Sequence, residues 1–138
     1  MSFIDLPFIN NEDGSITKIM YQNSSINKNI KEIYLNSVNY GKTKGWIYHK
    51  ESNLYLNIVN GRIDLSLIKK DSFAKGINGI NNFELDYRDR KMIYIEKNTW
   101  FKFKGIAKDS SIILVLSDQK HNPAESIKSS PNLFPKFE

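Results

Sequence analysis

The chain has 138 residues, a mass of 16.0 kDa and no cysteine, which indicates one domain over residues 1–138, without disulfides or thiolate metal sites. Its 20 Lys and Arg outnumber 15 Asp and Glu, for a formal charge of +5, but the lysines are scattered among acids and predict no nucleic-acid interface. No apolar stretch is long enough to span a membrane and the N-terminus lacks the pattern of a secretion signal, so we expect a cytoplasmic protein without a membrane partner.

Short runs of β-branched and aromatic residues follow one another along the chain. They cover residues 15–21, 32–38, 45–50, 54–59, 63–67, 82–87, 91–97, 100–106 and 111–117. The two central runs alternate apolar with other residues on either side of Asn60-Gly61, the dipeptide that a type I′ hairpin turn prefers. Gly, Asn, Asp or Ser separates most runs, which is typical of a sandwich or barrel. We therefore expect an all-β domain with a hairpin at Asn60-Gly61.

Two segments do not follow this pattern. Residues 23–33 have room for one turn of helix. Residues 122–138 hold three of the four prolines and are predicted to form an extended tail over the surface. Within this tail, Phe134 and Phe137 either pack on the domain or reach a partner.

Five motifs in chain order resemble those of one family. The segments NEDGSITKI, SVNYGKTKGWIYHK, SLIKKDS, IYIEKNTWFKFKGI and LSDQKHNPAESI are similar to DeRGxxxEi, pGvxRGxHxH, DLRxxS, IPxGxxHGF and sxxYxPxxEx of the dTDP-4-dehydrorhamnose 3,5-epimerase-like cupins. The strand GWIYHK also resembles the GGHAHK strand of sugar 3,4-ketoisomerases, with His49 at the second histidine. The resemblance implies a cupin-type jelly roll, a nucleotide-diphosphate sugar as ligand, no cofactor, a homodimer, and an isomerase role in cell-surface polysaccharide biosynthesis.

The chain differs from the family at the positions of the family's catalytic residues. The first histidine of the strand, which is the base in the epimerases, matches Ile47 here, and the histidine of IPxGxxHGF matches Phe101. The tyrosine that acts as acid falls at Val115. Two readings therefore stay open: an active epimerase or ketoisomerase that moves a proton beside a keto group, or an inactive sugar-nucleotide-binding or accessory cupin. An interaction module that shares only the architecture is a third.

His49 is the candidate base, because an imidazole titrates near neutral pH, with a pKa of about 6.5. The alternative is that His49 only hydrogen-bonds inside a polar barrel. Since side chains alternate along a strand, Ile47 and His49 share one face and Tyr48 takes the other. Tyr48, or else Tyr55 or Tyr94, is the candidate acid, and the alternative is that these strand aromatics only pack.

The resemblance also implies a set of substrate contacts. Lys44 and Lys69 match two family arginines and are expected on the diphosphate, and Ser72 completes the DLRxxS-like motif. Arg62 follows the hairpin turn and serves either the substrate or the dimer. Metal-binding cupins use several histidines, whereas His49 stands alone on its strand, so we predict no metal.

Overall fold

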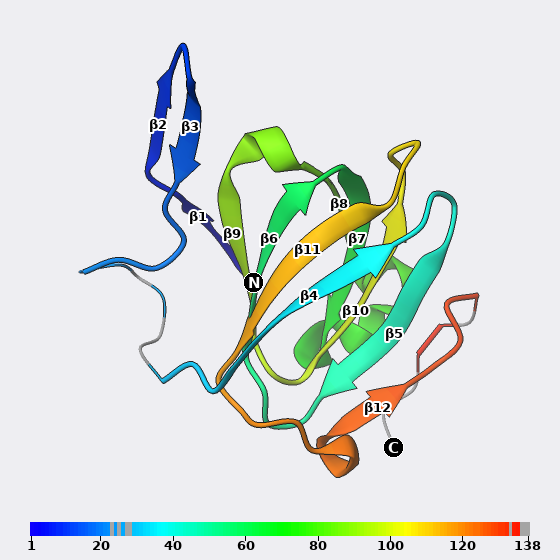
Figure 1. Ribbon diagram of the computed structural model, residues 1–138. Helices are drawn as coiled ribbons and strands as arrows, with labels where there is room; N and C mark the ends of the chain where they lie inside the picture. Colours follow the sequence, from blue (N-terminus) through cyan, green and yellow to red (C-terminus); the bar gives the residue numbers. More distant parts are fainter. Residues whose placement is uncertain (23, 25, 27–28, 133, 136–138) are drawn as a thin grey trace.

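The computed structural model describes residues 1–138 except 23, 25, 27, 28, 133 and 136–138. Two five-stranded antiparallel sheets face each other (Figure 1). The first sheet contains, in spatial order, β1 (Ser2–Asp5), β9 (Lys91–Ile95), β6 (Leu54–Asn60), β11 (Ser111–Ser117) and β4 (Glu32–Val38). The second contains β12 (Ser126–Lys128), β5 (Thr43–His49), β10 (Thr99–Gly105), β7 (Arg62–Lys69) and β8 (Asn81–Asp86). The all-β prediction is thus confirmed.

The main core lies between the two sheets. Apolar residues at every second position of the central strands point inward and form one cluster, which includes Leu54, Leu56, Ile58, Ile63, Leu65, Leu67, Phe101, Phe103, Ile113 and Val115. Each fully buried side chain of this kind stabilises the fold by about 1.5–3 kcal/mol. The facing apolar rows therefore explain why alternating runs in the sequence pack as two layers.

The Asn60-Gly61 turn joins β6 to β7, but these strands lie in different sheets and do not pair with each other. The predicted β-hairpin is therefore wrong, and the turn connects the two layers instead. Gly61 has φ 84°, in the left-handed region that favours glycine. Asn60 is not among the non-glycine residues with positive φ, so the turn is not of the predicted type I′, which needs positive φ at both central residues. A side chain there would also collide with Ser111, which accepts a hydrogen bond at Oγ from the Arg62 amide (3.1 Å). Glycine is therefore required at this turn both for its backbone conformation and for the close approach of β11.

A second apolar cluster covers the outer side of the second sheet. Its buried members are Trp46, Tyr48, Ile68 and Trp100. The segment η1 (Lys70–Gly79), which contains Phe73, and the C-terminal tail lie over it. The rings of Phe73 and Phe134 are 5.0 Å apart, so Phe134 packs on the domain, whereas Phe137 lies outside the described residues. The tail begins with η3 (Pro123–Glu125) and adds β12 to the sheet edge.

The N-terminal region differs from the sequence prediction. The first predicted strand, residues 15–21, is shorter in the structure: β3 (Gly14–Thr17) pairs only with β2 (Phe8–Asn11), and neither β1 nor β2 was predicted. The β2–β3 hairpin projects from the body (Figure 1). The helical turn expected within residues 23–33 is absent from the described residues of this segment: 24 and 29–31 are irregular, 26 is a bend, and 32–33 begin β4. Residues 23, 25, 27 and 28 lie outside the described part. No helix among the described residues is long and apolar enough to cross a membrane.

Candidate functional site

A small cavity opens between the sheets where β4 lies beside β5. Seven apolar side chains form its walls: Ile47, Leu54, Leu56, Phe101, Phe103, Ile113 and Val115. Its polar lining comes from Tyr34, Asn36 and His49. The cavity measures about 40 Å³, enough for a few water molecules but far below the ~300–1,000 Å³ of ligand pockets. A ligand the size of a sugar nucleotide therefore meets this site at its mouth.

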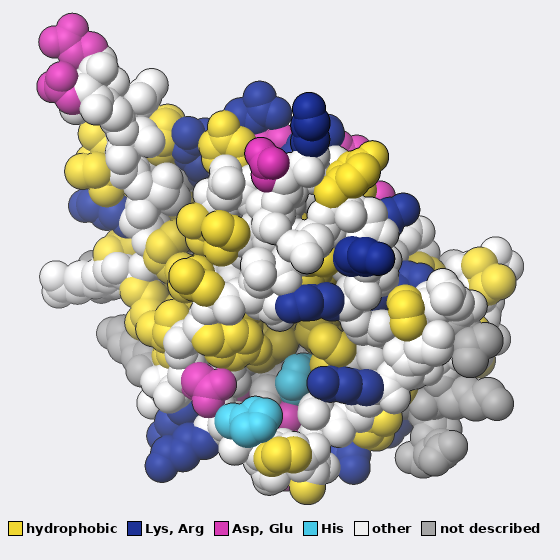
Figure 2. All heavy atoms as spheres, turned by 45° about the vertical axis from the view of Figure 1, so that its right-hand side comes forward, with side chains coloured by type: hydrophobic (Ala, Val, Ile, Leu, Met, Phe, Trp, Pro, Cys, Tyr) yellow, Lys and Arg dark blue, Asp and Glu magenta, His cyan; other side chains and the backbone are white. Residues whose placement is uncertain are grey.

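The mouth lies between two kinds of surface. Figure 2 looks at this side: both histidine side chains reach it, Lys and Arg side chains border one flank, and hydrophobic side chains border the other. Lys44 is one of the flanking cations, and its Nζ donates to Asn36 Oδ1 (2.7 Å). This bond joins β5 to β4 across the opening. Lys44 therefore lies beside the cavity, bonded to one of its lining residues, and its predicted role as a substrate contact stays a prediction.

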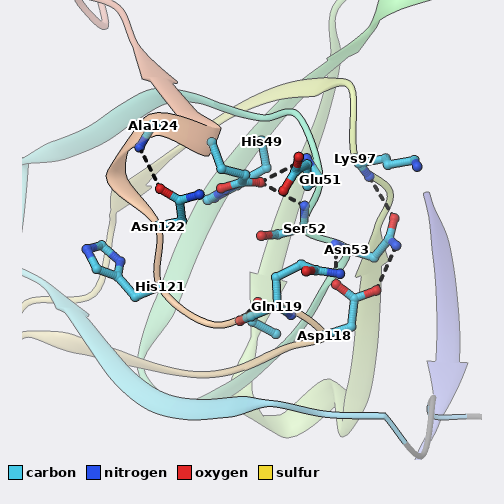
Figure 3. A network of polar contacts seen from close by, with 12 residues as sticks. His49, Glu51, Ser52, Asn53, Lys97, Asp118, Gln119, His121, Asn122 and Ala124 are labelled. Atoms are coloured by element: carbon cyan, nitrogen blue, oxygen red, sulfur yellow. Dashed lines mark hydrogen bonds and ion pairs between the residues drawn. The ribbon is translucent and has the colours of Figure 1, made fainter.

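The imidazole of His49 forms a hydrogen bond with the buried carboxylate of Glu125. Its Nδ1 lies 2.8 Å from Glu125 Oε2, and the Glu125 side chain is buried at the end of η3. Glu125 Oε1 accepts hydrogen bonds from the backbone amides of Glu51 (3.0 Å) and Ser52 (2.7 Å) (Figure 3). The ring of His49 also stacks on Phe101, with centroids 6.1 Å apart. The imidazole is therefore fixed on two sides.

The ionisation of Glu125 follows from these contacts. Burial raises the pKa of the Glu125 carboxyl, but the hydrogen bonds from His49, Glu51 and Ser52 together outweigh burial, so that its pKa lies below the usual value. A carboxylate that accepts several hydrogen bonds is stabilised in its charged form. At neutral pH, the group beneath His49 is therefore an anion.

Tyr34 stands on the opposite wall, on β4. It is paired in register with Val115 on β11, the position where the resemblance places the family's acid tyrosine. Burial raises the pKa of Tyr34, and the negative charges of Glu32 and Glu125 raise it further. Tyr34 is thus a protonated phenol that shares the cavity with His49.

Strand β4 has the reverse of the usual pattern. Tyr34 and Asn36 line the cavity, while Ile33 and Leu35 are 58% and 67% exposed on the other face. A half-buried strand normally places its apolar residues inward. In β4 the polar residues face a site and the apolar residues face outward.

Tyr48 lies on the other side of the second sheet. Its ring belongs to the outer apolar cluster beside Trp100, with centroids 5.2 Å apart. Its hydroxyl donates to Asn98 Oδ1 (2.6 Å), and burial raises its pKa. The alternation noted in the sequence already separates Tyr48 from His49, and the structure does not bring them together.

The other predicted substrate contacts are spread over the molecule. Lys69 pairs with Glu96 (3.7 Å) and Arg62 with Glu84 (3.1 Å), and neither cation lines the cavity. Ser72 lies in η1, which covers the outer side of the second sheet. Of the predicted site residues, His49 lines the cavity, and Lys44 bonds to its neighbour Asn36.

Three site residues, Tyr34, Asn36 and Glu125, were missed in the sequence. The strand 32–38 was identified, but the orientation of its two faces was not. Its polar residues at alternate positions were the available signal for Tyr34 and Asn36. Glu125 stands in the last family-like motif after Pro123, but nothing in the sequence alone indicates that it contacts His49, 76 positions away.

The described residues contain no group of three or more His, Asp or Glu side chains arranged to hold a metal ion. His121, the second histidine, lies on the loop after β11, where its backbone amide donates to Glu32 Oε2 (3.1 Å). That no metal is used stays a prediction.

A family model described as FdtA: WxcM-like, C-terminal matches residues 1–136 of the chain. None of the curated protein sequences matches significantly.

Several solved structures share the fold. A dTDP sugar isomerase from Desulfovibrio desulfuricans G20 superposes with a TM-score of 0.82 at 18% identity, over 95% of this chain and 84% of that chain. QdtA, a sugar 3,4-ketoisomerase from Thermoanaerobacterium thermosaccharolyticum in complex with TDP, gives 0.77 at 22% identity, over 93% and 87%. A dTDP-4-dehydrorhamnose 3,5-epimerase from Elizabethkingia anophelis NUHP1 gives 0.72 at 12% identity, over 94% and 75%. The cupin-type jelly roll is confirmed.

Proposed function

The chain belongs to the WxcM-like C-terminal (FdtA) family, and on that premise we propose that it is an isomerase of a nucleoside-diphosphate-linked 4-keto-6-deoxy sugar. The observation that carries this proposal is His49 on the cavity wall, with its ring fixed by Glu125. The structural relatives include proteins described as dTDP sugar isomerase and sugar 3,4-ketoisomerase, one of them in complex with TDP. TDP carries a negatively charged diphosphate, which suits the Lys and Arg side chains beside the mouth of the cavity (Figure 2).

The proposed reaction needs a base and an acid near one carbonyl group. His49 removes a proton from the carbon beside the carbonyl, and the electron pair passes to the carbonyl oxygen. Tyr34, which is protonated on the opposite wall, donates a proton to that oxygen. Protonated His49 then delivers its proton to one carbon of the enediol double bond, and the Tyr34 phenolate removes the proton of the hydroxyl on the other carbon, which becomes the carbonyl. Both residues thereby return to their starting states, so atoms and charge balance. Lys44 at the mouth binds the diphosphate.

The test is proton exchange in deuterated water. Purified protein is incubated with dTDP-4-keto-6-deoxyglucose, and the C3 and C5 protons are followed by NMR. We expect exchange in the wild type and none in His49→Ala or Tyr34→Phe, because general acid–base catalysis contributes 10²–10⁴-fold. His121→Ala is the matched control, since His121 bonds through its backbone on the rim. Exchange that persists in His49→Ala would rule out His49 as base.

A second candidate function is binding without chemistry. It is favoured by Ile47 and Phe101, apolar side chains that stand where the family has histidines and that leave only about 40 Å³ in the cavity. Loss of a base removes most of the rate but leaves binding largely intact. Saturable binding of the sugar nucleotide by calorimetry, together with no exchange in the wild type, would select this function.

A second copy of the chain is proposed to cover the apolar side of β4. Ile33 and Leu35 are exposed there. Ile9 and Ile16 are exposed on the projecting β2–β3 hairpin (Figure 1), and an isolated two-stranded hairpin is marginally stable in water. Light scattering should give a dimer for the wild type and a monomer for Leu35→Asp. Lys104→Asp, on the outer side of the second sheet, is the control.

Two further parts of the proposal come from the sequence. A role in cell-surface polysaccharide biosynthesis is tested by deleting the gene and analysing the sugars of the cell envelope. The cytoplasmic location stays a prediction, which fractionation of cells checks.

A further inference from the structure

The Glu125 carboxylate has a different partner for each oxygen. Oε1 is occupied by two backbone amides of the turn that follows β5, at 3.0 Å and 2.7 Å. Oε2 faces Nδ1 of His49 at 2.8 Å. The Glu125 carbonyl also accepts from the Lys50 amide (3.0 Å). The carboxylate is thus anchored to the strand that carries His49, and its second oxygen is directed at the ring.

We propose that Glu125 is a positioning residue that fixes His49 in the tautomer with its proton on Nδ1, so that Nε2 carries a free lone pair toward the cavity. An ionised carboxylate has acceptors only, so the hydrogen atom between Oε2 and the ring must belong to Nδ1. Within the part of the chain that the structure describes, no group hydrogen-bonds to Nε2. This inference rests on the proposed function only where it assigns Nε2 to proton transfer.

The surroundings of the ring support this orientation. Phe101, which is 3% exposed, stacks on the imidazole at an interplanar angle of 22° and covers one face of the ring. Because Glu125 is 7% exposed, little water reaches Oε2 to compete for the Nδ1 proton. The tautomer is therefore set by protein groups alone.

The same carboxylate acts on both members of the proposed pair. When Nε2 takes a proton from the substrate, the ring becomes a cation, and the negative charge of Glu125 at 2.8 Å stabilises it. That charge also raises the pKa of Tyr34, after the larger effect of burial, which keeps the phenol protonated. One buried anion thus favours a base on one wall and an acid on the other.

The tautomer can be read without any substrate. The chain has two histidines, so ¹⁵N-histidine labelling gives two ring systems, and His121→Ala assigns them. At pH 8 we expect the Nδ1 of His49 to show the shift of a protonated nitrogen and Nε2 that of an unprotonated one. The opposite assignment in the wild type would overturn the proposal, whatever the activity.

Variants separate positioning from folding. Glu125→Gln should give a mixture of His49 tautomers. It should also slow isotope exchange by roughly 10- to 100-fold at unchanged KM, because a misplaced proton removes only part of the rate that a general base contributes. Glu125→Asp should recover part of the rate, and Glu51→Gln, whose side chain is exposed, should change neither readout. A single Nδ1–H tautomer in a folded Glu125→Gln variant would refute the role. If this variant does not fold, the ¹⁵N spectrum of the wild type still shows which ring nitrogen of His49 carries the proton, and so still tests the proposal.

The two proposals fail in different ways. A wild type with the Nδ1–H tautomer but no proton exchange would leave the positioning role standing and reject the isomerase function. A wild type that exchanges protons with the Nε2–H tautomer would reject the positioning role alone.

Discussion

Phe101 controls the size of the cavity, and Phe101→Ala tests this directly. Phe101 is 3% exposed in the middle of β10, paired with Ile47 on one side and Leu67 on the other. Truncating a buried Phe to Ala costs about 3–5 kcal/mol, a large share of the ~5–15 kcal/mol that stabilises a typical domain. With a urea m-value of about 2 kcal/mol/M, the midpoint should fall by about 2 M.

The assay is urea unfolding followed by tryptophan fluorescence, with and without benzene. Most of the walls around Phe101 are apolar, and an apolar ligand such as benzene can fill a space of this kind, so benzene should restore part of the lost stability in Phe101→Ala and none in the wild type. Phe101→Leu is the control, with an expected loss below ~1.5 kcal/mol. A loss below ~1 kcal/mol in Phe101→Ala, without any effect of benzene, would show that the ring does not fill the interior and would refute the size argument.

Three further predictions concern the stability that Gly61, Asp118 and Glu125 give to the protein. Gly61→Ala should destabilise the protein by about 1–3 kcal/mol, since a methyl group at φ 84° would collide with Ser111; thermal unfolding measures this, and an unchanged Tm would contradict it. Asp118→Ala should cost about 1–3 kcal/mol in urea, because Asp118 accepts from the amide (2.9 Å) and side chain (2.8 Å) of Asn53; Asp118→Asn should cost less. Because its pKa in the folded state lies below the ordinary value of 4.5, Glu125 stabilises the protein above that pH and loses this contribution as the pH falls through its lowered pKa. The urea midpoint of the wild type should therefore fall from pH 6 to pH 3 more steeply than that of Glu125→Gln, and parallel curves would argue against it.

Much of the fold could be predicted because alternation is a local property. The strands from residue 32 to residue 117 and the turn at Asn60-Gly61 follow from apolar alternation and a turn-forming dipeptide, which are both read from adjacent positions. That the strands on either side of this turn enter different sheets is not contained in these local patterns. The short N-terminal strands carry too little alternation to stand out. Their pairing depends on distant segments: β1 pairs with β9, some 90 positions away.

The site was harder to predict because alternation groups residues by face without saying which face is inside. It separated His49 from Tyr48 correctly, but it gave no reason to place Tyr34 rather than Leu35 toward the cavity. The resemblance placed the acid at Val115, one strand away from the tyrosine that lines the same wall in register. Cross-strand neighbours of this kind are set by sheet register, which one sequence does not contain.

Strand β4 uses both of its faces, and this limits how the segment can vary. A substitution in β4 alters one face at a time, either the cavity wall at Tyr34 or the outer surface at Leu35. Insertion or deletion of a single residue within it is different, because side chains alternate with a period of two and every residue beyond the change would exchange faces. Such a change would turn Leu35 inward and Tyr34 outward, so the site and the outer surface would be lost in one step. Changes in chain length are therefore expected in the neighbouring loops and not within β4.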